Sequence, residues 1–291
     1  MLSKTTQREV YLTFDTEDFR NPKSLTALAN ILKTLNRHNL RGLFFITAEM
    51  AETIAKNHLI LRLLEDHYVG YHSNAHYVRP AIPQFTDVES YDEAVKISLI
   101  RETSRINPLT GEPEGEGGIK ILREIFTNHN ITAFRAPGHI WTPPHLNALQ
   151  KLGIKFDFSA KIFQNNVQYH NAAIYKGVCF CPFPKSMESR LAHLLYILFR
   201  RKKLCLETHE WAYINSDFKK LNLMLEYLAR LQRLGLVRVV PLPDGGIEIT
   251  NFTKSDILKT YYASIRYPRW RLNYKPRYLL SHFFHFFGLK E

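Results

Sequence analysis

The chain has 291 residues, of which 45% are hydrophobic and 13% aromatic. This length and composition fit a globular protein with a large core and exclude disordered and fibrous classes. The net charge of +12 favours anionic partners: nucleic acid, membrane phospholipid or a phosphate-bearing substrate. The polar residues 1–8 lead directly into an apolar run, so no secretory signal is expected. No apolar stretch approaches the roughly 20 residues that span a bilayer, and we expect a cytoplasmic protein.

Apolar runs that resemble buried strands alternate with amphipathic stretches along the chain. The expected strands are 9–14, 42–46, 68–72, 131–135, one near 156, 203–208 and 237–241. The expected helices are one that runs from an N-cap at Ser24 to residue 37, then 48–56, 91–106, 119–129, one opened by Pro143 and Pro144, and 218–234. Residues 107–118 are rich in Pro, Gly and Glu and predict a surface loop.

This alternation predicts an α/β fold in which helices cover a parallel sheet. About seven strand–helix units favour a complete or partly open barrel over an open doubly wound sheet. No internal repeat or linker is apparent, so residues 1–258 are expected to form one barrel domain. Residues 259–291 differ in composition and are expected to form a C-terminal extension.

Three cysteines in a chain of this length do not suggest a disulfide framework. Cys179 and Cys181 lie on one side of an expected strand and could hold a metal, but no second cysteine pair completes such a site. Buried, reduced cysteines are the favoured interpretation, because free cysteine packs as a small hydrophobic residue.

Polar clusters follow four of the expected strands, where a barrel of parallel strands places its working residues. The first contains Asp15, Glu17 and Asp18, three carboxylates in four positions that repel one another unless a positive charge lies among them. The second contains His72 and His76, which share one side of a helical turn and can bind one ion together. Separately these clusters could be a loop and a chance pair. Together they predict a metal site of one carboxylate and two histidines with open positions for water.

The other two clusters are Arg135-Ala136-Pro137-Gly138 and His209. An arginine directed into a pocket at a strand end usually pairs with carboxylates, although a surface turn is the alternative. A histidine at His209 titrates in the range that suits a general acid, although a structural histidine is the alternative.

In this order, TFDTED, HSNAH, RAPG, Asp157 in DFS, and LETH resemble the polysaccharide deacetylase family, also called the NodB-homology or carbohydrate esterase 4 family. The resemblance covers about residues 10–210, and HSNAH carries its most specific motif. It implies a distorted (β/α) barrel that removes acetyl groups from sugars with one divalent metal ion, for which zinc is expected.

The resemblance also implies roles for individual residues. Asp15 would be the general base, and His72 and His76 would bind the metal. Arg135 would orient the base, and Asp157 would hold that arginine. The last motif implies that His209 is the general acid and that Leu206 lines the pocket for the acetyl methyl group. The RAPG motif adds Pro137 and Gly138 as residues that contact the substrate.

The first motif departs from the family's usual pattern of two adjacent aspartates, the second of which binds the metal. Thr16 occupies that second position, and a hydroxyl is a poor substitute for a carboxylate. We assign Glu17 to the metal because its longer side chain could reach the ion, with Asp18 as the second choice. The fourth motif, around Asp157, also departs from the family's pattern, because it lacks the usual tryptophan.

The extension mixes seven Lys and Arg residues with tyrosines and with the run HFFHFF. Such a segment suits the surface of an anionic membrane, or it could pack its aromatic residues onto the barrel. No recognised motif accompanies the charge, so nucleic acid is not an expected partner.

The sequence therefore predicts a metal-dependent N-deacetylase that acts on a precursor of a cell-surface polysaccharide or lipopolysaccharide. The acetylated sugar would be linked to a nucleotide or lipid. The enzyme would work in the cytoplasm, with peripheral contact to the inner face of an anionic membrane. An amidohydrolase for a small cyclic amide or ureide is the first alternative. A catalytically silent carbohydrate-binding relative is the second.

Overall fold

The structure is a computed structural model that describes residues 7–76, 82–86, 88, 90–107, 109–139, 142–159, 173–175, 177–181, 184–189, 195, 202–215 and 218–248. The domain boundary predicted at residue 258 and the extension 259–291 lie outside these residues.

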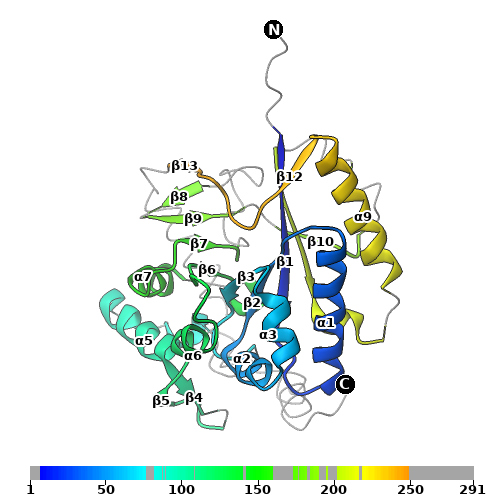
Figure 1. Cartoon of the computed structure of the whole chain (residues 1–291). Helices are drawn as coiled ribbons and strands as arrows, with labels where there is room; N and C mark the ends of the chain where they lie inside the picture. Colours follow the sequence, from blue (N-terminus) through cyan, green and yellow to red (C-terminus); the bar gives the residue numbers. More distant parts are fainter. Residues whose placement is uncertain are drawn as a thin grey trace.

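The strands and helices alternate through most of the described chain (Figure 1). The strands are β1 (Arg8–Thr16), β2 (Leu43–Ile46), β3 (Tyr68–Tyr71), β4 (Ser104–Ile106), β5 (Pro113–Glu116), β6 (Ala133–Phe134), β7 (Phe156–Asp157), β8 (Ala173–Tyr175), β9 (Val178–Phe180), β10 (Lys185–Ser186), β11 (Lys203–His209), β12 (Val237–Val239) and β13 (Ile247–Glu248). The helices are α1 (Pro22–Arg37), α2 (Ala48–Ala55), α3 (His58–Leu64), α4 (Ile82–Phe85), α5 (Tyr91–Thr103), α6 (Ile119–Ile125), α7 (Pro143–Lys151) and α9 (Lys219–Arg233), with 3-10 turns η1 (Pro137–His139) and η2 (Glu210–Tyr213).

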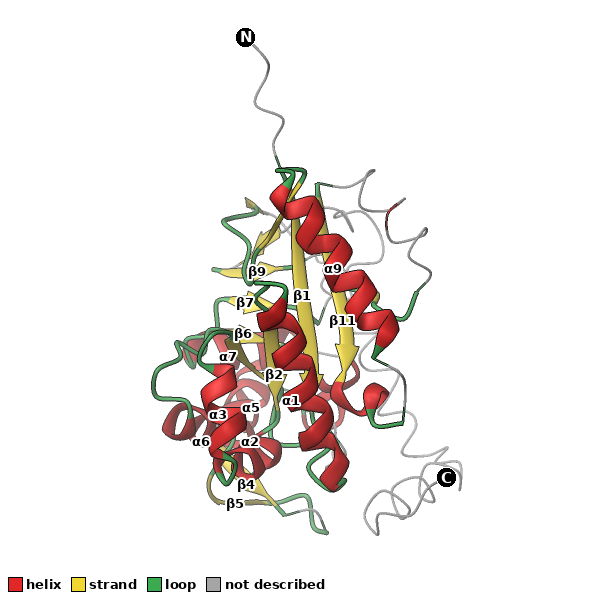
Figure 2. Ribbon diagram, turned by 45° about the vertical axis from the view of Figure 1, so that its right-hand side comes forward, coloured by secondary structure: helices red, strands yellow, loops and turns green. Residues whose placement is uncertain are grey.

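One curled sheet organises the fold. Eight of its strands run parallel in the order β10-β11-β1-β2-β3-β6-β7-β9 and form a half-barrel. Strand β12 also pairs with β1, and β8 pairs antiparallel with β9. Helices α1 and α9 lie along the sheet beside β1 and β11 in Figure 2, and α2, α3, α5, α6 and α7 cover the region around β2, β3 and β6. The predicted distorted (β/α) barrel is confirmed.

Strand alternation divides the core into two layers. The larger cluster joins one face of the strands to the apolar faces of the helices. The smaller cluster lies on the other, concave face, since it takes residues from strands around the sheet and none from a helix: Tyr11, Leu43, Phe45, Ala133, Phe158, Cys181 and Cys205. A side chain at Gly70 would meet the Phe45 ring at 2.7 Å, so this interior has room only for glycine there.

Three helix boundaries differ from the expectation, and one of them is the end of α6, which lies at Ile125 and not at residue 129. Helix α1 begins after Asn21, whose side chain accepts a hydrogen bond from the Lys23 N–H, so Asn21 and not Ser24 is the N-cap. Proline at the first helical position favours this earlier start. Helix α5 ends at Thr103, because the next residues form β4 and pair with β5 inside the segment that was expected to be a loop.

The structure also contains a helix that the sequence did not predict. Helix α3 is capped by Asn57, whose side chain accepts a hydrogen bond from the Ile60 N–H at 3.2 Å. Its seven residues bury only Ile60 and Leu64 fully, so its apolar pattern is too short to stand out in the sequence.

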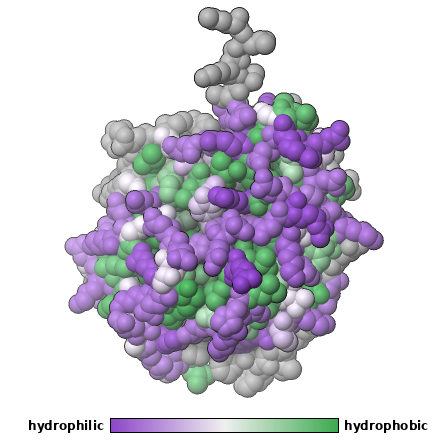
Figure 3. All heavy atoms as spheres, viewed as in Figure 1, coloured by the Kyte–Doolittle hydropathy of each residue, from purple (hydrophilic) through white to green (hydrophobic). Residues whose placement is uncertain are grey.

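The three cysteines are free and buried, as expected. Within the described residues, no helix is long and apolar enough to cross a membrane. On the face drawn in Figure 3, hydrophilic residues predominate among the described residues and hydrophobic residues lie between them.

Candidate active site and metal centre

The candidate site lies where neighbouring strands end. In the register of the sheet, Asp15 at the end of β1 pairs with His209 at the end of β11. The last residues of β3 and β6, Tyr71 and Phe134, are also paired, so His72 and Arg135 follow side by side. Parallel strands present their carboxyl ends at one edge of the sheet, and this edge therefore collects the four predicted clusters.

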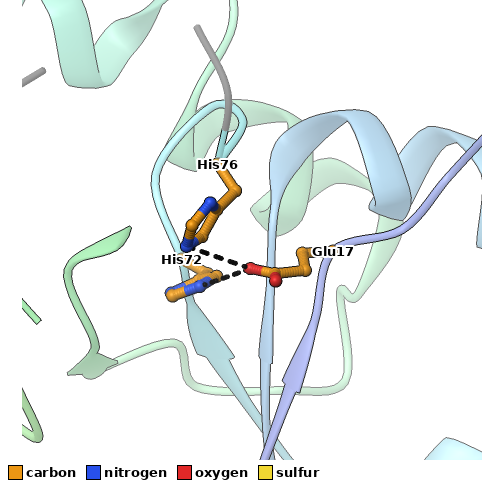
Figure 4. A group of neighbouring side chains, drawn as sticks. All are labelled: Glu17, His72 and His76. Carbon is orange, nitrogen blue, oxygen red and sulfur yellow. Dashed lines mark hydrogen bonds and ion pairs between the residues drawn. The ribbon is translucent and has the colours of Figure 1, made fainter. Parts of the chain in front are cut away.

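The predicted metal ligands converge in space, as Figure 4 shows. Glu17 follows β1, and the two histidines lie in the loop after β3. The Glu17 Oε2 atom lies 3.1 Å from His72 Nε2 and 3.7 Å from His76 Nε2. All three ligand atoms lie within 4.8 Å of one another.

This donor set fits a zinc ion. Ligand atoms around tetrahedral zinc, with bonds of about 2.0–2.2 Å, lie roughly 3.3 Å apart, and the two distances from Glu17 fall on either side of that value. His72 Nδ1 lies 2.7 Å from the carbonyl oxygen of Arg135 and must donate to it, because a carbonyl only accepts. With Nδ1 engaged in this way, Nε2 is the ring nitrogen that faces Glu17, and once it has lost its proton it offers its lone pair to a metal.

The predicted helical turn at HSNAH is absent. His72 and His76 lie in an irregular loop, in which Ser73 has φ 62°, a left-handed conformation that is costly for serine. The loop nevertheless brings both imidazoles to one side, because it passes over a buried carboxylate. Glu102 accepts hydrogen bonds from Ser73 Oγ at 3.0 Å and from Tyr71 OH at 2.6 Å.

Asp15 and Arg135 form a buried ion pair at the centre of the site. Arg135 Nη1 donates to Asp15 Oδ1 at 2.5 Å, and Nη2 donates to Thr13 Oγ1 at 2.8 Å. The Arg135 guanidinium also lies over the Phe45 ring, 4.5 Å from its centre. Burial raises the pKa of the Asp15 carboxyl, but the charges of Arg135, His72 and His209 outweigh it and hold this pKa well below its ordinary value. Asp15 is therefore an ionised carboxylate at neutral pH.

Burial and neighbouring charges also shift the pKa values of Glu17 and His72. Burial raises the pKa of Glu17, but the hydrogen bond from His72 and the charge of His76 outweigh it and lower this pKa to about 2. For His72, burial favours the neutral imidazole, but the charges of Asp15 and Glu17 prevail and raise its pKa. A bound cation would take over the role of that proton, because it neutralises the same two carboxylates.

His209 faces the free oxygen of Asp15. Its Nε2 lies 3.8 Å from Asp15 Oδ2, and its side chain is 27% exposed, so a substrate group can reach it. The Trp211 ring packs against the His209 ring, with centres 4.5 Å apart. Asp15 Oδ2 is thus flanked by His209 on one side and by His72, at 3.9 Å, on the other.

The structure gives Asp157 a different partner from the one expected. Among the described residues, its Oδ1 atom accepts hydrogen bonds from the N–H and the hydroxyl of Ser159, and no ion pair joins it to Arg135. Ser159 Oγ in turn accepts from the Ala136 N–H at 2.7 Å, so Asp157 supports the backbone that follows Arg135. Burial raises the pKa of Asp157 to about 6.

Pro137 and Gly138 form the turn η1, in which Gly138 has φ 65°. This turn brings His139 to Glu207, with His139 Nε2 3.1 Å from Glu207 Oε2. Asp15, His139 and Glu207 form a second group that could hold an ion. Arg135 lies between its two carboxylates, 2.5 Å from Asp15 and 3.9 Å from Glu207, and its charge already occupies the place of a cation.

Leu206 does not face the site. Along β11 the odd positions Cys205, Glu207 and His209 share the concave face, and Leu206 packs in the larger cluster against the helices. Residues three apart on a strand point to opposite sides, so Leu206 cannot lie beside His209 in the pocket. Glu207 takes the place toward the pocket that was expected for Leu206.

The two alternatives to Glu17 are also placed. Thr16 is fully buried, and its hydroxyl has no hydrogen-bond partner among the described residues. Asp18 accepts hydrogen bonds from Ser24 Oγ at 2.8 Å and from the Asn21 N–H at 3.3 Å, so it is engaged at the start of α1. The geometry therefore favours Glu17 as the carboxylate ligand.

Sequence reasoning missed several residues of the site. Glu102 and His145 form a fully buried pair at 2.7 Å beneath the HSNAH loop, but they are distant from the motifs in the sequence. Glu210 and Trp211 contact the Glu17 loop and directly follow His209. Only Glu207 had a usable signal, because its spacing of two from His209 places it on the same face of a strand.

A half-barrel with these side chains at its carboxyl edge places the chain among the (β/α)-barrel proteins. The sequence model of the polysaccharide deacetylase family matches residues 3–156, more than half of the chain. The chain belongs to the polysaccharide deacetylase family. This membership supports a hydrolase that deacetylates carbohydrate.

Three solved structures illustrate what the chain is similar to. A Mycobacterium smegmatis protein described as a polysaccharide deacetylase aligns with a TM-score of 0.51 and 15% identity, over 84% of this chain and 96% of that one. A family 4 carbohydrate esterase from Streptomyces lividans aligns with a TM-score of 0.47 and 14% identity, over 82% and 96%. The 4-alpha-glucanotransferase of Thermococcus litoralis aligns with a TM-score of 0.51 and 9% identity, over 87% of this chain and 40% of that one. At such low identity these similarities show the fold alone. A search of curated proteins found no match.

Proposed function

We propose that the chain is a metal-dependent hydrolase that removes an N-acetyl group from a sugar. The observation that carries this proposal is the meeting of Glu17, His72 and His76 beside the ion-paired carboxylate of Asp15. These groups supply a site for one divalent ion, with zinc as the expected metal, and a proton acceptor next to it. Family membership supports the carbohydrate substrate.

The residues of the chain divide the work of amide hydrolysis. A divalent ion held by Glu17, His72 and His76 would supply Lewis-acid activation of the acetyl carbonyl and of water. Asp15 is ionised and fixed by Arg135 through Oδ1, so its Oδ2 atom is free to accept a proton from the attacking water. His209 is close enough to Asp15, and sufficiently exposed, to protonate the departing sugar amine.

The natural substrate proposed here is a precursor of a cell-surface polysaccharide or lipopolysaccharide, linked to a nucleotide or a lipid diphosphate. The net charge of +12 supports an anionic substrate. We also propose a cytoplasmic location with peripheral contact to the inner face of an anionic membrane through residues 259–291. Liposome flotation with and without the residues after Lys259 tests this contact. Equal recovery of both forms in the soluble fraction would contradict it.

The activity is tested by a mass-spectrometric screen for loss of one acetyl group. The substrates are acetylated sugars, acetylated sugar nucleotides and a panel of small cyclic imides and ureides. We expect zinc-loaded protein to release acetate from at least one sugar, and His72→Ala protein to release none. Hydrolysis of imides alone would instead show an amidohydrolase. A folded wild-type protein that binds no metal and hydrolyses nothing would be a silent relative.

A further inference from the structure

The segment that follows the candidate general acid contacts the candidate metal ligand. His209 ends β11, and the next two residues, Glu210 and Trp211, open the turn η2. Both reach across to the loop after β1 that carries Glu17 (Figure 4 shows the position of Glu17 in this loop). One contact fixes the backbone of that loop and the other fixes the Glu17 side chain.

Glu210 holds the backbone. Its side chain is fully buried, and its Oε1 atom accepts hydrogen bonds from the N–H of Glu17 at 2.9 Å and from the N–H of Asp18 at 2.6 Å. These two N–H groups lie beyond the end of β1 and before the start of α1, where no strand or helix pairs them. A single carboxylate oxygen therefore fixes the direction in which the Glu17 side chain leaves the loop.

Trp211 holds the carboxylate. Its indole Nε1 donates to Glu17 Oε1 at 3.1 Å, and the other oxygen, Oε2, is the one that faces His72 and His76. The Trp211 ring is 46% exposed but does not move freely, since it packs on the His209 ring and is tied to Glu17. The two oxygens of Glu17 thus have separate partners, and one is left for a metal.

A glutamate ligand needs this support more than an aspartate would. It has one more rotatable bond, so ordering a glutamate side chain costs more conformational entropy than ordering an aspartate. A side chain that is already held in the binding geometry does not incur that cost when the ion binds. Hydrogen-bond partners of metal ligands generally act in this way.

We propose that Glu210 and Trp211 are positioning residues that clamp Glu17 in place as the third metal ligand. This inference rests on the metal site of the proposed function. A merely structural role for Glu210 and Trp211 would affect stability and leave metal affinity unchanged. The clamp, in contrast, predicts weaker metal binding in protein whose fold is intact.

The test measures the zinc dissociation constant by competition with a chromophoric chelator, on the full chain. Glu210→Ala removes the acceptor of both N–H groups, and we expect its affinity to fall about 10–100-fold. Glu210→Gln keeps an oxygen at that position and should stay near wild type. Trp211→Phe keeps a ring against His209 and loses only the hydrogen-bond donor, so its zinc affinity should fall by about tenfold.

Tyr213→Phe is the matched control. Tyr213 lies in the same turn, but its hydroxyl contacts Thr208 and Glu188 and not Glu17, so its zinc affinity should not change. Circular dichroism and melting of the metal-free proteins confirm the fold. The visible absorption of cobalt-loaded protein adds a signature of the ligand set: the Trp211→Phe spectrum should shift toward that of Glu17→Gln.

The outcomes separate the clamp from the site itself. Wild-type protein that binds zinc, together with folded Trp211→Phe that binds it equally well with an unchanged cobalt spectrum, overturns the clamp and leaves the proposed function in place. Wild-type protein that binds no zinc overturns both. If Glu210→Ala does not fold, Trp211→Phe still decides the question, because the Trp211 side chain is partly exposed and its replacement should leave the fold intact.

Discussion

The site has two halves that differ in burial and in what neutralises their carboxylates. In one half, Asp15 and Arg135 are almost completely buried and pair with each other. In the other half, Glu17 faces His72 and His76, and the side chain of His76 is 41% exposed. The first half is complete within the protein, whereas the second has positions open to a metal and to substrate.

This difference shows how one strand end can supply two kinds of carboxylate. Asp15 is the last residue of β1 on the concave face, where the interior holds Arg135 against Phe45. Glu17 lies two residues later, beyond the strand, where the loops after β1 and β3 meet. A fixed, buried anion suits proton transfer, and an anion between two imidazoles suits metal binding.

The largest expected effect is on the rate when Asp15 is neutralised. Asp15→Asn should lower acetate release by about 10²–10⁴-fold, the usual contribution of a general base, and should keep its zinc. Asp18→Asn is the matched control, because Asp18 is bound to Ser24 outside the metal group. Acetate release and zinc content are measured together. Full activity in folded Asp15→Asn protein would show that Asp15 is not the general base.

The next effect is on stability. Arg135→Met keeps an apolar stem of similar length over Phe45 but removes the hydrogen-bonded cation from the buried Asp15, which should cost about 3–5 kcal/mol of unfolding free energy. Arg105→Met is the control, since Arg105 pairs with Glu52 at the surface and its loss should cost only about 0–1 kcal/mol. Urea denaturation compares the two variants. Equal losses would show that burial does not distinguish these pairs.

In the half that contains Glu17, His72 and His76, substitution of the exposed histidine should affect metal binding more than stability. His76→Ala removes one proposed ligand, so zinc affinity should fall by more than the roughly 10–100-fold expected for an outer partner. Because the His76 side chain is 41% exposed, the stability of the metal-free protein should change by no more than about 0.5 kcal/mol. Chelator competition and thermal melting give the two values. The exposed His58→Ala serves as the control for both.

The smallest effect is a difference in pH dependence between the halves of the metal-free protein. The pKa of Asp15 is lowered on folding, so its contribution to stability is present above the unfolded value of about 3.9 and is lost as pH falls through the lower folded value. The pKa of His72 is raised, so its contribution is present below about 6.5 and is lost as pH rises through the folded value.

Melting curves in a metal-free buffer test this contrast. They are measured from about pH 3 to about pH 8, a range that includes the unfolded-state pKa values of both aspartate and histidine. The stability advantage of wild type over Asp15→Asn should shrink toward the acidic end. Its advantage over His72→Gln should shrink toward the alkaline end. Parallel changes in both comparisons would contradict the separate environments of the two residues.

The sequence predicted the barrel because buried strands and amphipathic helices alternate with different periods. It placed most elements to within a few residues, and it missed what depends on local hydrogen bonds. The Asn21 cap, the short helix α3 and the β4–β5 pair are of this kind. The left-handed Ser73 is another such feature, because the spacing of the histidines predicts a helical turn at HSNAH.

The sequence predicted the catalytic residues and metal ligands of the site, but it did not predict the residues that hydrogen-bond to the loops that carry them. Asp15, Glu17, His72, His76, Arg135 and His209 are brought together at one edge. Glu102 and Glu210 support the two ligand loops from positions that no local pattern marks. The prediction for Leu206 is wrong, because the alternation of β11 turns Leu206 to the face opposite His209.

The most direct test of the account is the position of zinc in crystals of the zinc-loaded protein, located by anomalous scattering at the zinc edge. The account predicts one ion about 2.0–2.2 Å from Glu17 Oε2, His72 Nε2 and His76 Nε2. Zinc bound by Asp18, or by Asp15 together with His139 and Glu207, would contradict the assignment of the two halves. Full zinc occupancy in Glu17→Gln crystals would contradict it equally.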